Sequence, residues 1–150
     1  MQLRTTSETL SFIKDHERKL IDMYSQISER FPQSDATGVL ASSIKEIKGY
    51  IQELDRSYYS VITDAIEGCF GFDLNAEKYE TDETTPADLS CEACLDKAIA
   101  VEKRLLDLYQ DAADQSASLL ADVPRSMRII SRKRTNRLEK IKALRDTIKS

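Results

Sequence analysis

Apolar residues recur at alternating steps of three and four positions in four separate segments of this 150-residue chain. The segments run over residues 10–31, 40–65, 95–119 and 127–148. This spacing is typical of an α-helix that turns one face toward neighbouring helices. The sequence therefore predicts an all-α bundle of four helices, each with one buried face.

The lengths of the connections predict how these helices are joined. The first and last connections are short, so each joins two antiparallel neighbours. The middle connection is long enough to run the length of a bundle. We therefore expect an antiparallel bundle of two helical hairpins joined by a long crossover. The predicted single domain covers residues 1–150, with hairpins over about 5–67 and 86–149 and a crossover over about 68–85.

Local patterns predict where three of the helices begin. Thr5 and Glu8 have the spacing of a capping box. Residues 85–88 offer a cap followed by a proline at the first helical position, and Asp122 with Pro124 repeats that arrangement. We therefore expect helices to start close to residues 6, 86 and 123.

The composition limits the class of protein. The chain is 41% hydrophobic and 32% charged with four Gly and three Pro, which is unlike a disordered or turn-rich all-β protein. No apolar run approaches the roughly 18 residues of a membrane span, and the first residues lack the pattern of a signal peptide. We expect a soluble cytoplasmic protein that does not insert into membranes. Three cysteines are an odd count, which argues against a disulfide framework.

The first and third helical segments contain similar stretches. HERKLIDMY at residues 16–24 and VEKRLLDLY at residues 101–109 align without a gap. Both place a glutamate on the apolar face and a tyrosine two turns later. This likeness indicates that a helix pair was duplicated.

The paired glutamates, the tyrosines that follow them and the long crossover together resemble the ferritin-like superfamily, and within it the rubrerythrin-like domains. In that family the first and third helices each supply one Glu, and the second and fourth each supply Glu-x-x-His, to hold two irons. The resemblance implies that Glu17 and Glu102 are vestigial metal ligands. His16, the sole histidine, points about 100° away from Glu17 on a helix, so we expect it at solvent or a helix boundary.

The motif positions of the second and fourth helices carry other residues. In the fourth, Arg134 and Arg137 have the spacing of Glu-x-x-His and are in phase with the apolar residues. In the second, the in-phase pair is Ile47 and Tyr50, whereas Glu46 lies off the apolar face. A guanidinium has no lone pair to offer a metal. We therefore expect no cofactor, with iron only if an atypical ligand set forms.

Two acids and two bases would then share one layer of the core. Their formal charges sum to zero, and the planar fork of arginine suits paired carboxylates. We therefore expect a buried polar network in place of the metals. Its predicted members are Glu17, Glu102, Arg134, Arg137, Tyr24, Tyr109 and Tyr50. In the alternative arrangement, the two arginines reach from the edge of the helix face to water.

Cys91 and Cys94 form a CxxC pattern near the start of the third helix. A helix N-terminus lowers thiol pKa values, so these residues are possible redox thiols. They equally suit the apolar positions of a helix start, which is the interpretation we favour. Cys69 lies beside aromatic residues and is predicted to pack beneath the crossover.

Aromatic and apolar residues near the end of the second helix exceed what one buried face needs. They either pack under the crossover or form the interface of a homodimer, since rubrerythrin-like bundles commonly associate side by side. The residues are Tyr58, Tyr59, Val61, Ile62, Phe70 and Phe72. Tyr79 is expected to fasten the acidic crossover to the bundle.

The charge is unevenly distributed along the chain. Residues 125–150 hold ten Lys or Arg and two acids, a net +8, so the other residues carry 12 bases and 24 acids, a net −12. A basic helix binds nucleic acid or an anionic surface, or packs against the acidic part of its own chain. We favour packing within the chain, because this helix also has a regular apolar face.

Three functions follow from these observations. The first is a non-catalytic, rubrerythrin-like bundle that acts as a structural or interaction module. The second is a rubrerythrin-like, metal-binding oxidoreductase whose atypical ligand set includes Glu17 and Glu102. The third, which we favour least, is a binder of nucleic acid or anionic surfaces through the outer face of the last helix. The basic residues of that face are Arg128, Arg132, Lys133, Lys140 and Arg145.

Overall fold

The computed structural model describes residues 1–63, 72–116 and 122–148, with side chains described up to residue 58 in the first of these ranges. Within these residues the chain is all-α with four long helices, as predicted, together with two very short strands and one turn of 3₁₀ helix. The elements are β1 (Gln2–Leu3), α1 (Thr6–Arg30), α2 (Ala36–Thr63), β2 (Leu74–Asn75), η1 (Ala76–Tyr79), α3 (Cys91–Ser116) and α4 (Asp122–Thr147). No described helix is both long and apolar enough to cross a membrane.

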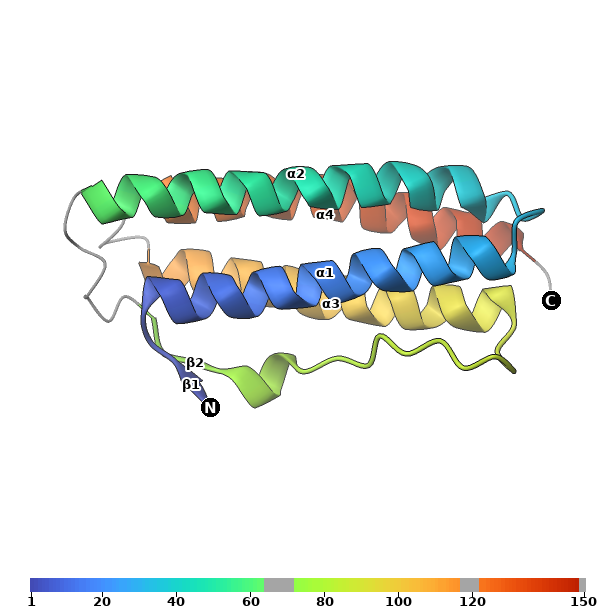
Figure 1. Cartoon of the computed structure of the whole chain (residues 1–150), viewed down its shortest axis with the longest axis horizontal. Coiled ribbons are helices and arrows are strands. Elements are labelled where there is room, and N and C mark those ends of the chain that lie inside the picture. The colour runs from blue at the N-terminus through green and yellow to red at the C-terminus, as the bar shows by residue number, and fades with distance from the viewer. Residues whose placement is uncertain (64–71, 117–121, 149–150) are drawn as a thin grey trace.

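The four helices form two antiparallel pairs (Figure 1). α1 packs against α2 and α3, and α4 packs against α3 and α2. Between β2 and the start of α3, the chain runs along the outside of the bundle beside α1 and α3 (Figure 1). As a result α2 and α3 point in the same direction.

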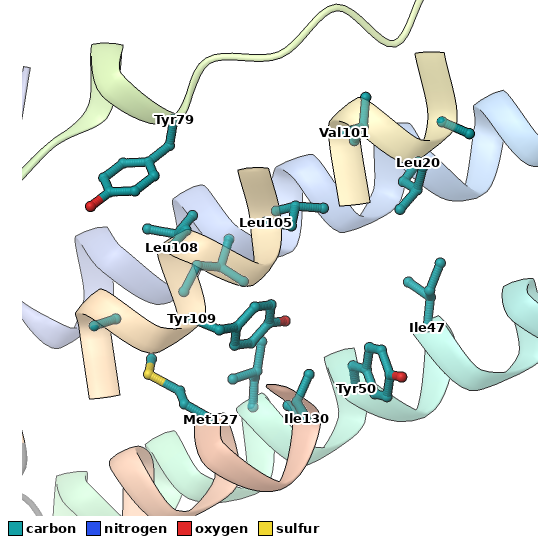
Figure 2. Close-up of a cluster of buried hydrophobic side chains, with 14 of the residues drawn as sticks. Leu20, Ile47, Tyr50, Tyr79, Val101, Leu105, Leu108, Tyr109, Met127 and Ile130 are labelled. Carbon is teal, nitrogen blue, oxygen red and sulfur yellow. The ribbon is translucent and has the colours of Figure 1, made fainter. Parts of the chain in front are cut away.

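The core lies between the four helices and follows the predicted spacing. In α1 the buried apolar residues Leu10, Ile13, Leu20 and Ile27 are separated by about one or two helical turns. Figure 2 shows Leu20 facing the same interior as Leu105 of α3. Burying one such side chain contributes about 1.5 to 3 kcal/mol. Amphipathic helices with these faces are stable chiefly because they pack together.

Local chemistry sets the start of α1 as predicted. The Thr5 hydroxyl accepts a hydrogen bond from the backbone N–H of Glu8 at 3.1 Å, and the Glu8 carboxylate accepts one from the backbone N–H of Thr5 at 3.1 Å. Both halves of the capping box are therefore present. α4 begins at Asp122, within a residue of the predicted start.

The predicted start of α3 near residue 86 is wrong, because the helix begins at Cys91. The backbone N–H of Leu89 donates to the carbonyl of Pro86 at 3.1 Å, which closes a turn before the helix. The Ser90 hydroxyl then accepts from the backbone N–H of Ala93 at 3.1 Å. Ser90 is therefore the capping residue, and the crossover is longer than expected.

The crossover is fastened along its length to the bundle. β2 pairs with β1 in an antiparallel register that matches Leu3 with Leu74, an interaction that the sequence did not predict. Tyr79 is buried and donates to Asp111 of α3, so it fastens the crossover as expected. Further along, the Thr85 hydroxyl donates to the side chain of Gln26 in α1 at 2.7 Å.

The aromatic cluster near the end of α2 is described only in part. Tyr58 is partly buried and packs against the core, and Phe72 is buried. The side chains of Tyr59, Val61 and Ile62, together with Cys69 and Phe70, lie outside the described residues. The two described members therefore pack within the chain.

The position of the α3 cap generates a testable prediction. Ser90→Ala should lower the free energy of unfolding by about 1 kcal/mol, because it removes an acceptor from the first turn. Asp88→Ala, an exposed residue at the start predicted from the sequence, should leave stability within about 0.5 kcal/mol of the parent. Urea unfolding followed by circular dichroism measures both variants. Equal losses would contradict a helix that begins at Cys91.

Candidate functional site

Two glutamates and two arginines meet at the centre of the bundle. Glu17 of α1 and Glu102 of α3 have no exposed surface, and neither has Arg134 of α4. Arg137, one turn further along α4, is 3% exposed. The two arginines therefore lie inside the bundle and do not reach out to water.

The guanidinium of Arg134 lies between the two carboxylates. Its Nη1 donates to Oε1 of Glu102 at 2.7 Å. Its Nη2 donates to Oε2 of Glu17 at 2.6 Å and also contacts Oε1 of that residue. One side chain of α4 thus connects α1 to α3. A planar guanidinium achieves this because its donors point outward in a fixed fork.

Arg137 forms a second, two-bond pair with the same glutamate. Its Nε donates to Oε2 of Glu102 at 2.8 Å, and its Nη2 donates to Oε1 at 2.8 Å. Such parallel charge-assisted hydrogen bonds are among the stronger ones in proteins. Glu102 is consequently held by both arginines.

Each tyrosine of the two repeated segments donates a hydrogen bond to the glutamate of the other segment. Tyr24 of α1 donates to Oε2 of Glu102 in α3 at 2.7 Å. Tyr109 of α3 donates to Oε2 of Glu17 in α1 at 2.6 Å. The sequence repeat therefore corresponds to a reciprocal pair of contacts across the bundle.

α2 supplies the outer end of the network. Nη1 of Arg137 donates to the Tyr50 hydroxyl at 2.7 Å, and that hydroxyl donates to Glu46. Glu46 also lies 3.4 Å from Arg137, and its side chain is 34% exposed. Sequence reasoning missed Glu46 because it is off the apolar face. Its position four residues before Tyr50, which makes the two neighbours on a helix, is the signal that could have identified it.

Burial and charge act in opposite directions on the ionisable groups. Burial alone would raise the pKa of Glu102, but Arg134, Arg137 and the Tyr24 hydroxyl outweigh it and hold that pKa below 4.5. Burial alone would lower the pKa of both arginines, and the glutamates raise it instead. Glu102 and the two guanidiniums therefore stay charged, and the formal charges of the two glutamates and two arginines sum to zero.

The tyrosines remain protonated donors. Burial, followed by the neighbouring glutamate, raises the pKa of Tyr24 and of Tyr109 well above 10. The ring of Tyr109 also lies 5.5 Å from Cζ of Arg134, and the ring of Tyr50 lies 5.4 Å from it. Figure 2 shows these two rings entering the interior from α3 and α2. Arg134 is thus surrounded by π-electron faces as well as carboxylates.

The donor set does not fit the two irons of the family that the sequence resembles. Each of the four carboxylate oxygens of Glu17 and Glu102 already accepts at least one hydrogen bond. A metal ion at this position would have to displace the guanidinium of Arg134. In the described part of the chain, no group of three or more His, Cys, Asp or Glu residues is placed to hold a metal ion.

The expectation that His16 lies at solvent or a helix boundary is wrong. It is 3% exposed, with Nδ1 at 3.1 Å from Oε1 of Glu83 and 3.2 Å from the Thr81 hydroxyl. Its ring packs edge-on against Phe12. The crossover covers this face of α1, which periodicity within the helix could not indicate. His16 therefore helps to hold the crossover against α1.

The two cysteines at the start of α3 are free thiols. Cys94 is buried, and burial raises the pKa of its thiol despite a contact of 3.7 Å from Nη1 of Arg30. Cys91 is half-buried, with its Sγ 3.7 Å from the Ser34 hydroxyl. Cys94 is therefore not activated as a thiolate, which favours its packing role.

Part of the basic face of α4 is neutralised within the chain. Arg128 lies 3.3 Å from Asp114, and Arg145 lies 2.7 Å from Glu92 and 2.6 Å from Asp96. Three exposed residues of the predicted face form no ion pair with any described residue, namely Arg132, Lys133 and Lys140. This arrangement lowers the charge available for an anionic surface.

Comparisons of the chain with protein family models, with curated proteins and with solved structures found no match.

Arg134→Met should lower the free energy of unfolding by about 3 to 5 kcal/mol, because it leaves Glu17 and Glu102 buried without their shared cation. Arg132→Met, an exposed arginine on the same helix, is the matched control and should change stability by less than about 0.5 kcal/mol. Urea unfolding followed by circular dichroism measures both.

Replacing both glutamates and both arginines together distinguishes the cost of an unpaired buried charge from the cost of lost packing. Glu17→Met, Glu102→Met, Arg134→Met and Arg137→Leu combined should cost less than Arg134→Met alone, because no buried charge is left unpaired. A combined loss as large as that of the single variant would show that packing, and not charge, sets the cost.

The lowered pKa of Glu102 predicts a pH dependence. A folded-state pKa below 4.5 means that Glu102 stabilises the fold above that pH and loses its contribution as the pH falls further. The free energy of unfolding should therefore decline as the pH falls below about 4.5, and less steeply in Glu102→Gln. Glu139→Gln, an exposed glutamate of α4, is the control and should keep the parent slope. Equal slopes in all three proteins would refute the assignment.

Proposed function

We propose that this chain is a non-catalytic, rubrerythrin-like bundle of the ferritin-like type, in which an internal ion network stands where relatives hold two irons. In this proposal the protein acts as a structural or interaction module. The observation that carries it is the position of the Arg134 guanidinium between the carboxylates of Glu17 and Glu102.

Electrostatics supports this interpretation. A pair of carboxylates in a dry core is costly without a compensating positive charge, which metals would supply in a di-iron protein. Here Arg134 and Arg137 supply that charge from within the chain. The exchange replaces Lewis-acidic ions with cations that have no vacant coordination position.

The arrangement of the helices supports the family assignment. Two antiparallel helical pairs are joined by a crossover that runs along the bundle, and α1 and α3 carry the repeated Glu and Tyr. The proposal also includes a homodimer, which rests on the resemblance alone. Light scattering after size-exclusion chromatography tests that part.

Metal analysis tests the proposal directly. Protein purified without chelator, and protein incubated anaerobically with Fe²⁺, should contain far less than one transition-metal ion per chain. The competing hypothesis, a metal-binding oxidoreductase that uses Glu17 and Glu102, requires about two ions per chain. Finding two ions that are lost in Glu17→Gln would refute the proposal.

A gain-of-function variant tests the register of the site. Arg134→Glu and Arg137→His, combined with Ile47→Glu and Tyr50→His, would place the ligand types of a di-iron site around Glu17 and Glu102. The folded variant should bind Mn²⁺ or Zn²⁺, measured by calorimetry, whereas the parent should not.

The control carries Arg134→Met, Arg137→Leu and Tyr50→Phe, which remove the same polar groups but add no ligand. It should bind neither ion. Failure of the folded four-substitution variant to bind metal would mean that the ferritin-like register is incorrectly assigned.

A further inference from the structure

A groove of about 640 Å³ lies between α2 and α4. This pair of helices is on the side of the bundle away from the crossover (Figure 1). The volume falls within the roughly 300 to 1,000 Å³ that is usual for small-molecule sites. The groove lies outside the buried carboxylates and goes beyond the proposed function, although Tyr50 and Glu46 line it and also contact the outer end of the network.

The floor of the groove is apolar. Tyr50 and Ile130 line it and are 3% and 1% exposed, and Figure 2 shows them close together on the two helices. Ile129 stands at the rim with 38% of its surface exposed, which is unusual for a large apolar side chain in the described part of this protein. Gly49 of α2 also lines the groove, and a Cβ added there would meet no atom within 4 Å. The groove thus has open space above an apolar base.

The groove has a small excess of positive charge, because its two lysines outnumber the one acid that no separate arginine neutralises. Of its two acids, Glu53 accepts from Arg56 at 3.0 Å. Glu46 bonds to Tyr50 and contributes one negative charge, because Arg137 beside it is already balanced by Glu102. Its two lysines, Lys45 from α2 and Lys133 from α4, are exposed and form no ion pair with a described residue. One exposed ammonium therefore comes from each helix, and that of Lys133 also acts electrostatically on Glu53.

We propose that this groove binds a small organic anion. Its carboxylate, sulfonate or phosphate would pair with Lys45 and Lys133, and an attached apolar or aromatic group would lie on Ile129, Ile130 and Tyr50. The geometry favours a flat apolar group, because Gly49 lets it approach the backbone of α2. Charge pairing and apolar contact act together in such a site.

An environment-sensitive fluorescent anion tests the proposal. The chain contains no tryptophan, so the emission of 8-anilinonaphthalene-1-sulfonate can be followed without interference from one. We expect saturable binding of one probe per chain. The uncharged N-phenyl-1-naphthylamine has a similar shape and should bind at least several-fold more weakly.

Lys45→Gln combined with Lys133→Gln should weaken binding of the sulfonate about tenfold, because two ionic contacts are lost. Binding of the uncharged probe should not change. An absence of sulfonate binding in the parent, or equal binding of both probes, would refute an anion site.

Gly49→Leu provides the second test. The added side chain has room and a better helix propensity, so the protein should keep or gain stability while the groove is filled. Sulfonate binding should fall at least tenfold. Gly38→Leu is the matched control, because Gly38 lies in the same helix with equally open space and does not line the groove.

Thermal unfolding and far-ultraviolet circular dichroism establish that each variant is folded. Retained binding in folded Gly49→Leu would place the probe elsewhere and refute the proposal. A loss of binding in Gly38→Leu as well would also refute it, because the effect would then not be local to the groove.

Discussion

The contact of one guanidinium with two carboxylates constrains the rest of this bundle. Arg134 must reach Glu17 on α1 and Glu102 on α3 at the same time, so the three helices are fixed in both rotation and height relative to one another. Apolar packing alone sets such a register weakly, because neighbouring turns of a helix present similar surfaces. If one helix shifted by a turn, a buried group with directed donors would lose its hydrogen-bond partners.

Such a network determines how the helices are aligned more than it adds to the stability of the fold. The attraction between buried charges largely offsets the cost of removing them from water, so an apolar core of the same shape would hold the helices about as firmly. The reciprocal bonds of Tyr24 and Tyr109 raise the cost of any misaligned packing, because each would leave a hydroxyl and a carboxylate unpaired. In this molecule the charged centre specifies which of several similar packings is adopted.

Periodicity accounts for what could be predicted from the sequence. Arg134 and Arg137 share the phase of the apolar residues of α4, and both side chains are buried. The misplaced features depend on contacts between distant segments. His16 would be exposed on an isolated helix, but residues 81–83 cover it. The proline at residue 86 looks like the first residue of a helix, but it belongs to a turn that precedes α3. Within-helix spacing contains no information on either.

The helices contribute different groups to the charged centre. α1 and α3 repeat the same Glu and Tyr, whereas α4 supplies both cations and α2 supplies Tyr50 and Glu46. Because Glu46 is part-exposed, the chain of contacts from Glu102 through Arg137 and Tyr50 ends at the surface between α2 and α4. The groove with the exposed lysines opens at that same place. A ligand seated there would touch the outer end of the charged centre, so occupancy of the surface and the packing of the core would be linked through Tyr50.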